Sequence, residues 1–382
     1  MQESAQTTVA SEVAKLKNLN ATNGGALITN PGTGEILAMV GSRNYFDQEI
    51  DGNVNVTLAY LQPGSSIKPI NYAVGLMKGY SAASPFIDKA TCFPGRPTYC
   101  PKNYDGKYHG VVSMRQALGN SFNIPAVQML KVNGLDAMIA TASAMGITTF
   151  QDPSRYGLSL TLGGGEVTMT DMATAFGVFA NRGYRIDLHP ILKVTDKTGN
   201  VLEEYHAPSS PIFGKRVLPP GVAFIISDIL QDNSARITAF GPNSALRIPD
   251  QVVSVKTGTT NDYRDNWTIG YTPSLLVATW VGNNDHTPMR GIVSGVTGAA
   301  PIWNKLMTEF LKGKKPERML QPSDVVTRAS CTISGTPPPA EGCQTRREYF
   351  LKGIAIKQPT SKREKVFIDK ATGDLAAPGQ TE

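Results

Sequence analysis

The most constraining stretch of the chain is residues 62–69, in which Ser65 precedes Lys68 by three positions directly after a Pro-Gly pair. The Pro-Gly pair predicts a turn, and the apolar run 70–77 that follows predicts a helix. Positions i and i+3 of a helix share a face, so the hydroxyl and the amine would lie side by side at its start. A lysine whose pKa is lowered can take the proton of such a serine and make it a nucleophile. The alternative is a serine N-cap followed by a solvated lysine.

Composition describes an ordinary globular protein. The chain has 382 residues, of which 41% are hydrophobic and 18% charged, enough for one large core or two smaller ones. The formal net charge of +6 fits an anionic partner such as a cell-wall polymer, although a diffuse excess of Lys and Arg is the alternative. Basic residues do not form an arm with interleaved aromatics, so we expect no nucleic-acid partner. Without a signal peptide or a run of ~18 apolar residues, the sequence is either cytosolic or an excised extracellular segment.

The four cysteines fall into two close pairs, each within a loop rich in Pro and Gly. Cys92 and Cys100 form the first pair, and Cys331 and Cys343 form the second. Neither spacing is Cys-x-x-Cys and the four histidines are scattered, so we expect no zinc site, no other metal and no cofactor. Two loop-closing disulfides in an oxidising compartment are the preferred interpretation. Four reduced cysteines remain the alternative.

Apolar periodicity predicts both helices and strands. The expected elements are a helix over 2–17, a β-hairpin over 25–40, helices over 113–118, 124–130, 135–145, 170–181, 217–233 and 301–312, a hairpin over 190–206, and three antiparallel strands between 252 and 281. Residues 79–110 are expected to be a long irregular segment. Composition changes near 313–315, and the tail contains one further expected hairpin at 366–376.

Two more motifs make a catalytic interpretation of Ser65 and Lys68 much more specific. Ser121-Phe122-Asn123 lies between two predicted helices, and Lys256-Thr257-Gly258 ends a predicted strand. Ser-x-x-Lys, Ser-x-Asn and Lys-Thr-Gly in this order form the motif set of penicillin-binding proteins and serine β-lactamases. Each motif alone is common, but the ordered set, with each member in its expected setting, indicates acyl transfer through a serine.

The chain resembles the transpeptidase domain of class A penicillin-binding proteins over roughly residues 3–312. The resemblance is carried by residues 30–41, 62–69, 103–110, 239–245 and 256–264. It implies an α+β fold: a central, mostly antiparallel five-stranded sheet flanked by helices, plus an all-helical subdomain carrying the Ser-x-Asn loop. It also implies a linker helix (1–20) after a missing upstream glycosyltransferase domain, a transpeptidase domain (21–314) and a Pro/Gly-rich C-terminal extension with a short β-hairpin (315–382).

The resemblance assigns a role to each catalytic residue. Ser65 would attack the D-Ala-D-Ala peptide bond, and Lys68 would be its general base. Ser121 would relay protons, and Lys256 would lower the pKa of Lys68 as a second cation. Ser66 is a rival nucleophile, but its i+3 position is a proline.

Substrate would be held by a second group of residues. The resemblance implies that Asn123 hydrogen-bonds the substrate backbone. It also implies that a substrate strand lies along the sheet edge at Gly258, which has no side chain. It assigns the terminal carboxylate to Thr257 and Thr259. The oxyanion hole would be the backbone N–H groups of Ser65 and Thr259.

The implied function is that of a D,D-transpeptidase, which cross-links peptidoglycan stem peptides through an acyl-serine and is inhibited covalently by β-lactams. Its partners would be the D-Ala-D-Ala donor, an amine acceptor and β-lactam antibiotics. Its place would be extracytoplasmic, with membrane contact only through a missing N-terminal anchor. The alternatives are a D,D-carboxypeptidase or β-lactamase that uses water, and a non-catalytic β-lactam sensor or cell-wall-binding module.

Overall fold

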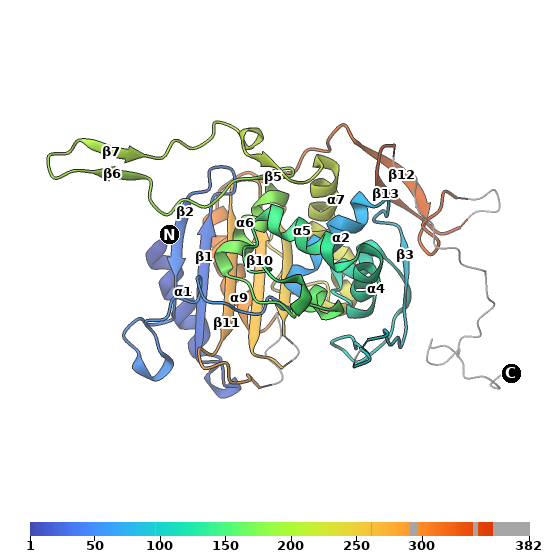
Figure 1. The fold of residues 1–382 in the computed structure, drawn as a ribbon, viewed down its shortest axis with the longest axis horizontal. Coiled ribbons are helices and arrows are strands. Elements are labelled where there is room, and N and C mark those ends of the chain that lie inside the picture. The colour runs from blue at the N-terminus through green and yellow to red at the C-terminus, as the bar shows by residue number, and fades with distance from the viewer. Residues whose placement is uncertain (96, 261, 291–295, 339–342, 354–382) are drawn as a thin grey trace.

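A five-stranded antiparallel sheet forms the centre of the molecule (Figure 1). The computed structural model describes residues 1–382 apart from 96, 261, 291–295, 339–342 and 354–382. The strand order is β2-β1-β11-β10-β9, and every neighbouring pair is antiparallel. The strands are β1 (Asn23–Thr29), β2 (Ile36–Val40), β9 (Ser254–Thr259), β10 (Asp265–Tyr271) and β11 (Leu276–Gly282).

Both faces of the sheet are buried because apolar residues occupy both sides of the pleat. In β1, Leu27 belongs to one hydrophobic cluster, while Ala26 and Ile28 belong to the other. The second cluster is closed by two helices that cover one face: α1 (Gln2–Ala14) and α9 (Ala299–Leu311). These two helices lie far apart in the sequence and side by side in space (Figure 1).

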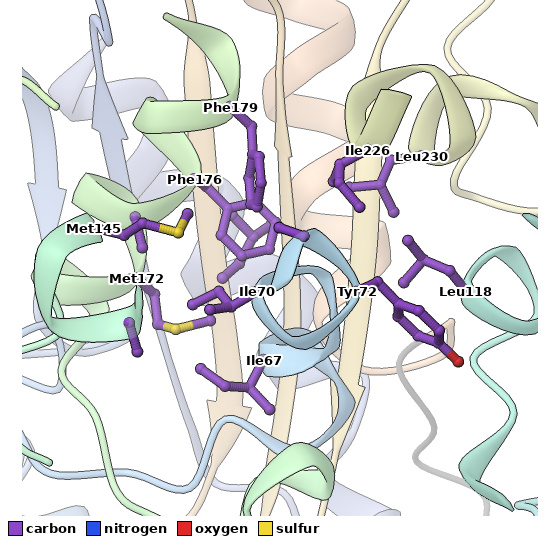
Figure 2. Packing of buried hydrophobic residues seen from close by; sticks show 14 of the residues in the cluster. Ile67, Ile70, Tyr72, Leu118, Met145, Met172, Phe176, Phe179, Ile226 and Leu230 are labelled. Atoms are coloured by element: carbon purple, nitrogen blue, oxygen red, sulfur yellow. The ribbon is translucent and has the colours of Figure 1, made fainter. Parts of the chain in front are cut away.

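Helix α2 (Lys68–Met77) lies at the centre of the other face, and it carries the proposed general base. Figure 2 shows Ile67, Ile70 and Tyr72 of this segment surrounded by side chains from several helices. Helix α2 is buried on nearly every side by other helices, and the turn η3 that precedes it packs against β9 and β10. The surrounding helices are α3 (Met114–Gly119), α4 (Asn123–Asn133), α5 (Leu135–Met145), α6 (Met169–Ala180) and α7 (Pro220–Gln231).

Smaller elements complete the fold. The β6–β7 hairpin projects away from the body of the molecule (Figure 1). The paired strands are β3 (Pro85–Asp88) with β4 (Gly110–Ser113), β5 (Tyr184–Arg185) with β8 (Lys215–Arg216), β6 (Lys193–Thr195) with β7 (Val201–Glu204), and β12 (Val325–Cys331) with β13 (Thr345–Leu351). The short helices are α8 (Ile237–Phe240), η1 (Lys17–Leu19), η2 (Gln48–Ile50), η3 (Gly64–Ile67), η4 (Pro153–Arg155), η5 (Leu158–Leu162), η6 (Pro211–Phe213) and η7 (Asn233–Arg236).

The expected fold class and most expected elements are confirmed, with three differences. The α-helix after the Pro-Gly pair begins at Lys68, and Ser65 lies in the preceding 3-10 turn η3. The segment 79–110, expected to be irregular, contains β3 and begins β4 because its two ends pair with each other. The tail contains the β12–β13 ribbon, which was not expected, while the hairpin expected at 366–376 lies outside the described residues.

Both expected disulfides are confirmed. Cys92 is bonded to Cys100, and Cys331 is bonded to Cys343, so the alternative of four reduced cysteines is wrong. The second bridge joins Cys331, the last residue of β12, to Cys343, which lies two residues before β13, and so closes the ribbon. Among the helices that the structure describes, none has the length and apolarity needed to cross a bilayer.

Candidate active site

The turn that carries Ser65 is packed directly against the end of β9. Gly64 has a φ of +53°, and a Cβ added there would lie 2.6 Å from the carbonyl oxygen of Thr259. A Cβ on Gly258 would lie 2.2 Å from the carbonyl oxygen of Pro63. Only glycines allow the two backbones to approach this closely. The serine turn and the Lys-Thr-Gly strand can therefore lie in contact because Gly64 and Gly258 have no side chains.

The two serines of this turn have different surroundings. The Ser65 side chain is half-buried at the cavity described below, whereas Ser66 is fully buried. The Ser66 hydroxyl donates a hydrogen bond of 2.7 Å to the carbonyl of Pro63. Ser66 therefore stabilises the turn, and Ser65 presents its hydroxyl to the cavity. Ser65 is not the N-cap of an α-helix, since Ile67 occupies that position of α2.

Lys68 is completely buried and points at the Ser-x-Asn turn, which lies between α3 and α4. Its Nζ donates to the backbone carbonyls of Ser121 (2.6 Å) and Phe122 (3.1 Å) and to Oδ1 of Asn123 (2.7 Å). The hydroxyl of Ser121 lies 3.5 Å from the same nitrogen. Ser121 has a φ of +63°, a conformation that few non-glycine residues adopt and that often marks functional sites.

Lys256 reaches the same serine from the sheet. It is 3% exposed on β9, and its Nζ donates to the Ser121 hydroxyl (2.8 Å) and to the carbonyl of Thr257 (2.8 Å). Ser121 therefore lies between two buried lysines that come from α2 and β9. The three motifs, distant along the chain, converge as the sequence predicted.

Burial and a neighbouring cation lower the pKa of each lysine. The pKa of Lys68 lies well below its usual value, chiefly because of burial and secondly because of the nearby Lys256 cation, while Asp88 acts in the opposite direction. The pKa of Lys256 falls to about 7, again chiefly through burial and secondly through Arg236. A depressed lysine pKa is the condition under which a lysine can act as a base near neutral pH.

The site opens into a cavity of about 460 Å³. Five of the predicted residues line it: Ser65, Ser121, Asn123, Thr257 and Thr259. Gly258, the remaining substrate-binding prediction, contributes its bare backbone to the contact with the serine turn. Within the described residues, no cluster of three or more His, Cys, Asp or Glu side chains could hold a metal ion.

Several residues at this cavity were not predicted. Aromatic side chains form part of its wall, including Tyr104 and Tyr263, whose rings meet edge to face at 6.1 Å. Both belong to stretches that carried the family resemblance, so a signal for them existed. Arg236 and Asp88 act on the lysines from buried positions, and no local pattern marks either as functional.

Comparison with known proteins agrees with this geometry. Residues 24–308 match the family model described as the penicillin-binding protein transpeptidase domain. Penicillin-binding protein 1A of Neisseria meningitidis is 33% identical over 340 residues, which cover 88% of this chain and 40% of that protein. Penicillin-binding protein 1A of Clostridium botulinum is 31% identical over 370 residues, which cover 92% of this chain and 43% of the relative.

Solved structures show the same fold. The crystal structure of penicillin-binding protein 1A from Haemophilus influenzae has a TM-score of 0.76 and 26% identity, covering 90% of this chain and 55% of that one. Penicillin-binding protein PonA1 from Mycobacterium tuberculosis has a TM-score of 0.71 and 23% identity, covering 88% of this chain and 89% of that one. PonA1 has also been solved in complex with penicillin V. The match of the family model over most of the chain, together with relatives at 33% identity, shows that this chain belongs to the transpeptidase domain family of class A penicillin-binding proteins.

Proposed function

We propose that this chain is a serine D,D-transpeptidase that acylates Ser65 with a peptidoglycan stem peptide and transfers the acyl group to an amine. The observation that carries the proposal is the convergence of Lys68 and Lys256 on Ser121, at a cavity that Ser65 also lines. Neither a structural core nor a simple binding surface needs two buried lysines with lowered pKa values beside one hydroxyl.

Acylation would begin with proton transfer from Ser65 to a neutral Lys68. A new bond forms between Oγ and the carbonyl carbon, and the proton passes to Nζ. The resulting ammonium has three N–H bonds, which match its three close acceptors in the Ser121–Asn123 turn. The site is therefore organised to stabilise Lys68 after the transfer, when it carries a positive charge.

Ser121 would complete the first half-reaction as a proton relay. Its hydroxyl accepts a hydrogen bond from Lys256, so its own proton is free to point toward the nitrogen of the leaving D-alanine. The C–N bond breaks as that nitrogen receives the proton, and Ser121 is reprotonated from Lys68. In the second half-reaction an acceptor amine attacks the ester, the C–O bond to Ser65 breaks, and the proton returns to the serine.

Substrate recognition would use the end of β9. Thr257 and Thr259 line the cavity, and protonated Lys256 supplies positive charge for the terminal carboxylate. The backbones of the serine turn and of Thr259 lie in contact, so their N–H groups can serve as the oxyanion hole. Asn123 would keep Lys68 in place through Oδ1 and offer an amide N–H to the substrate backbone.

The main alternative, hydrolysis by water, needs a carboxylate or other base for deacylation. Among the described residues that line the cavity, the one carboxylate is that of Asp105, and it lies 3.1 Å from the ring of His109. Glu166, which directly follows three glycines at 163–165, is exposed, and we assign it no role. Lys68 could serve water or an amine alike, so the cavity lining does not separate the two. The match to a transpeptidase family model and to class A relatives makes an amine the better supported second substrate. A binding module without activity is less consistent with the intact lysine pair.

The wider setting follows from the relatives and is part of the proposal. The chain spans about 40% of the length of the Neisseria relatives that it matches. We propose that residues 21–314 form the transpeptidase domain, that 1–20 link it to an upstream glycosyltransferase domain and membrane anchor, and that 315–382 form a C-terminal extension. Action on peptidoglycan places the domain outside the cytoplasm, where two disulfides are stable.

Mass spectrometry of the protein after exposure to penicillin tests the proposal. We expect one penicilloyl adduct, mapped to the peptide that contains Ser65, with a lifetime of minutes to hours. A stem-peptide thioester with an added D-amino acid should then give the aminolysis product. Rapid turnover of penicillin would favour the hydrolase, and failure of both reagents to acylate the protein would leave only a binding module.

A further inference from the structure

We propose that Asp88, Asn103 and His109 form a positioning network, in which a buried carboxylate holds the turn that carries Ser121 and Asn123. The inference rests on the proposed acylation of Ser65. Asp88 is 0% exposed at the end of β3, so it cannot contact substrate and must act through its neighbours. We call these three residues the Asp88 network.

Asn103 connects the carboxylate to the start of helix α4. Its Oδ1 accepts a hydrogen bond of 2.8 Å from the backbone N–H of Asn123, the first residue of α4. Its Nδ2 donates to both carboxylate oxygens of Asp88, at 3.0 and 2.7 Å. The N-cap of α4 is Phe122, which offers no side-chain acceptor, so Asn103 satisfies an N–H that the helix leaves free. Asp88 thereby fixes the orientation of the amide that caps the catalytic turn.

His109 connects the same carboxylate to the middle of the turn. The His109 backbone N–H donates to Asp88 Oδ2 at 3.0 Å, and its Nδ1 lies 2.7 Å from the same oxygen. Its Nε2 lies 3.1 Å from Asp105 Oδ2, so the ring lies between two carboxylates. The ring stacks on Phe122 with centroids 3.9 Å apart and planes 15° from parallel. Phe122 in turn presents the carbonyl that accepts a hydrogen bond from Lys68.

The network also places a negative charge that acts on the general base, Lys68. The negative charge of Asp88 raises the pKa of Lys68, against the larger lowering by burial and by Lys256. Asp88 therefore limits how far burial depresses the base. Other titratable and charged groups face Asp88 and Lys68 from the surrounding elements. Tyr72 lies on α2, and Asp88 also raises its pKa. Lys256 lies on β9, where Arg236 of η7 acts on it, and His109 and Asp105 lie beside the carboxylate.

Two variants separate the roles of position and charge. Asn103→Ala removes the cap on Asn123, and we expect the maximal acylation rate to fall by about 10- to 100-fold because the turn shifts relative to Lys68. Asp88→Asn removes the charge, and we expect the acid limb of the rate profile to move to lower pH by about half a unit to one unit. The direction follows because a lysine that loses a neighbouring anion releases its proton more readily. Neither variant should change the half-saturating penicillin concentration by more than about threefold.

The assay is stopped-flow acylation of the intact protein by a fluorescent penicillin between pH 5 and 10, with rates normalised to the fraction that becomes labelled. Asn283→Ala is the matched control, because Asn283 is 2% exposed, does not line the cavity, and ties Thr22, Asn20 and Thr287 together just beyond the end of β11. This control should lower thermal stability and leave the rate unchanged.

Each result decides a specific point. Slower acylation in Asn103→Ala but not in Asn283→Ala, with unchanged half-saturation, supports positioning. A shift of the acid limb to lower pH in Asp88→Asn supports the role of the charge. If Asp88→Asn does not fold, the comparison of Asn103→Ala with Asn283→Ala decides the inference. Rates within twofold of wild type in both network variants overturn the inference. An unlabelled wild-type protein would instead overturn the proposed function itself.

Discussion

Replacing each of the two adjacent serines by alanine should separate catalysis from stability. The Ser65 hydroxyl is half-buried at the cavity, and the residue caps no α-helix, so Ser65→Ala should change the free energy of unfolding by less than about 0.5 kcal/mol. Its acylation should fall at least ~10³-fold, because no other hydroxyl replaces the nucleophile.

Ser66→Ala should have the opposite effects. It removes a buried hydrogen bond of 2.7 Å to Pro63, whose carbonyl keeps a second bond of 3.2 Å from the backbone N–H of Ser66. We expect a loss of about 1 kcal/mol, or a few degrees or less in the unfolding midpoint of a chain this long. Acylation should remain within a fewfold of wild type.

The assay for both variants combines urea unfolding with the rate of labelling by a fluorescent penicillin. The wild-type protein and both variants are compared at the same pH and protein concentration. Persistent labelling of Ser65→Ala would show that the nucleophile is wrongly assigned. Loss of labelling in Ser66→Ala with unchanged stability would refute the division of roles between the two side chains.

Three further predictions concern charge, backbone and the C-terminal ribbon. Lys256 has a pKa of about 7, so the acylation rate should decline as the pH rises through 7 and its positive charge is lost. Lys256→Arg should remove this alkaline limb of the rate profile. An unchanged limb would contradict its assignment to Lys256. Gly64→Ala should cost about 2–4 kcal/mol in urea unfolding, against about 1 for Gly199→Ala, which shares a positive φ but has open space; equal losses would show that the contact with β9 is unimportant. Glu348→Gln should cost about 2–3 kcal/mol, since it leaves the buried Arg115 without a partner from the ribbon; a loss below about 0.5 would show that this pair does not anchor the ribbon.

The local pattern of the sequence determined the elements and the chemistry they carry. Alternating and helical apolar spacing gave the hairpin at 25–40, the three strands between 252 and 281 and most helices, because burial on one or two faces leaves a short-range period. The motif residues Ser65, Ser121 and Lys256 could be named because their three motifs occur together and in the order of a known catalytic set. The spacing of the cysteines likewise indicated both disulfides.

The tail shows where local pattern is insufficient. The middle of β12 and the first three residues of β13 are exposed, and some of the buried positions are polar, so apolar alternation in the ribbon is too weak to predict it. It is held instead by a buried ion pair between Glu348 and Arg115 of α3, and Arg115 also pairs with Asp228. These partners are more than a hundred residues apart, and no window of sequence contains both.

What only the tertiary structure decided is the state of the reactive groups. The low pKa values of Lys68 and Lys256 arise chiefly from burial beneath helices and strands drawn from the whole chain. A nearby cation adds to each effect, Lys256 for Lys68 and Arg236 for Lys256. The supporting residues Asp88 and Arg236 act on the lysines through space, and no sequence motif marks either of them. Residue identity is local, whereas desolvation and Coulomb interaction depend on every element that excludes water from the site. The sequence therefore named the participants, and the packing of distant segments set their charges.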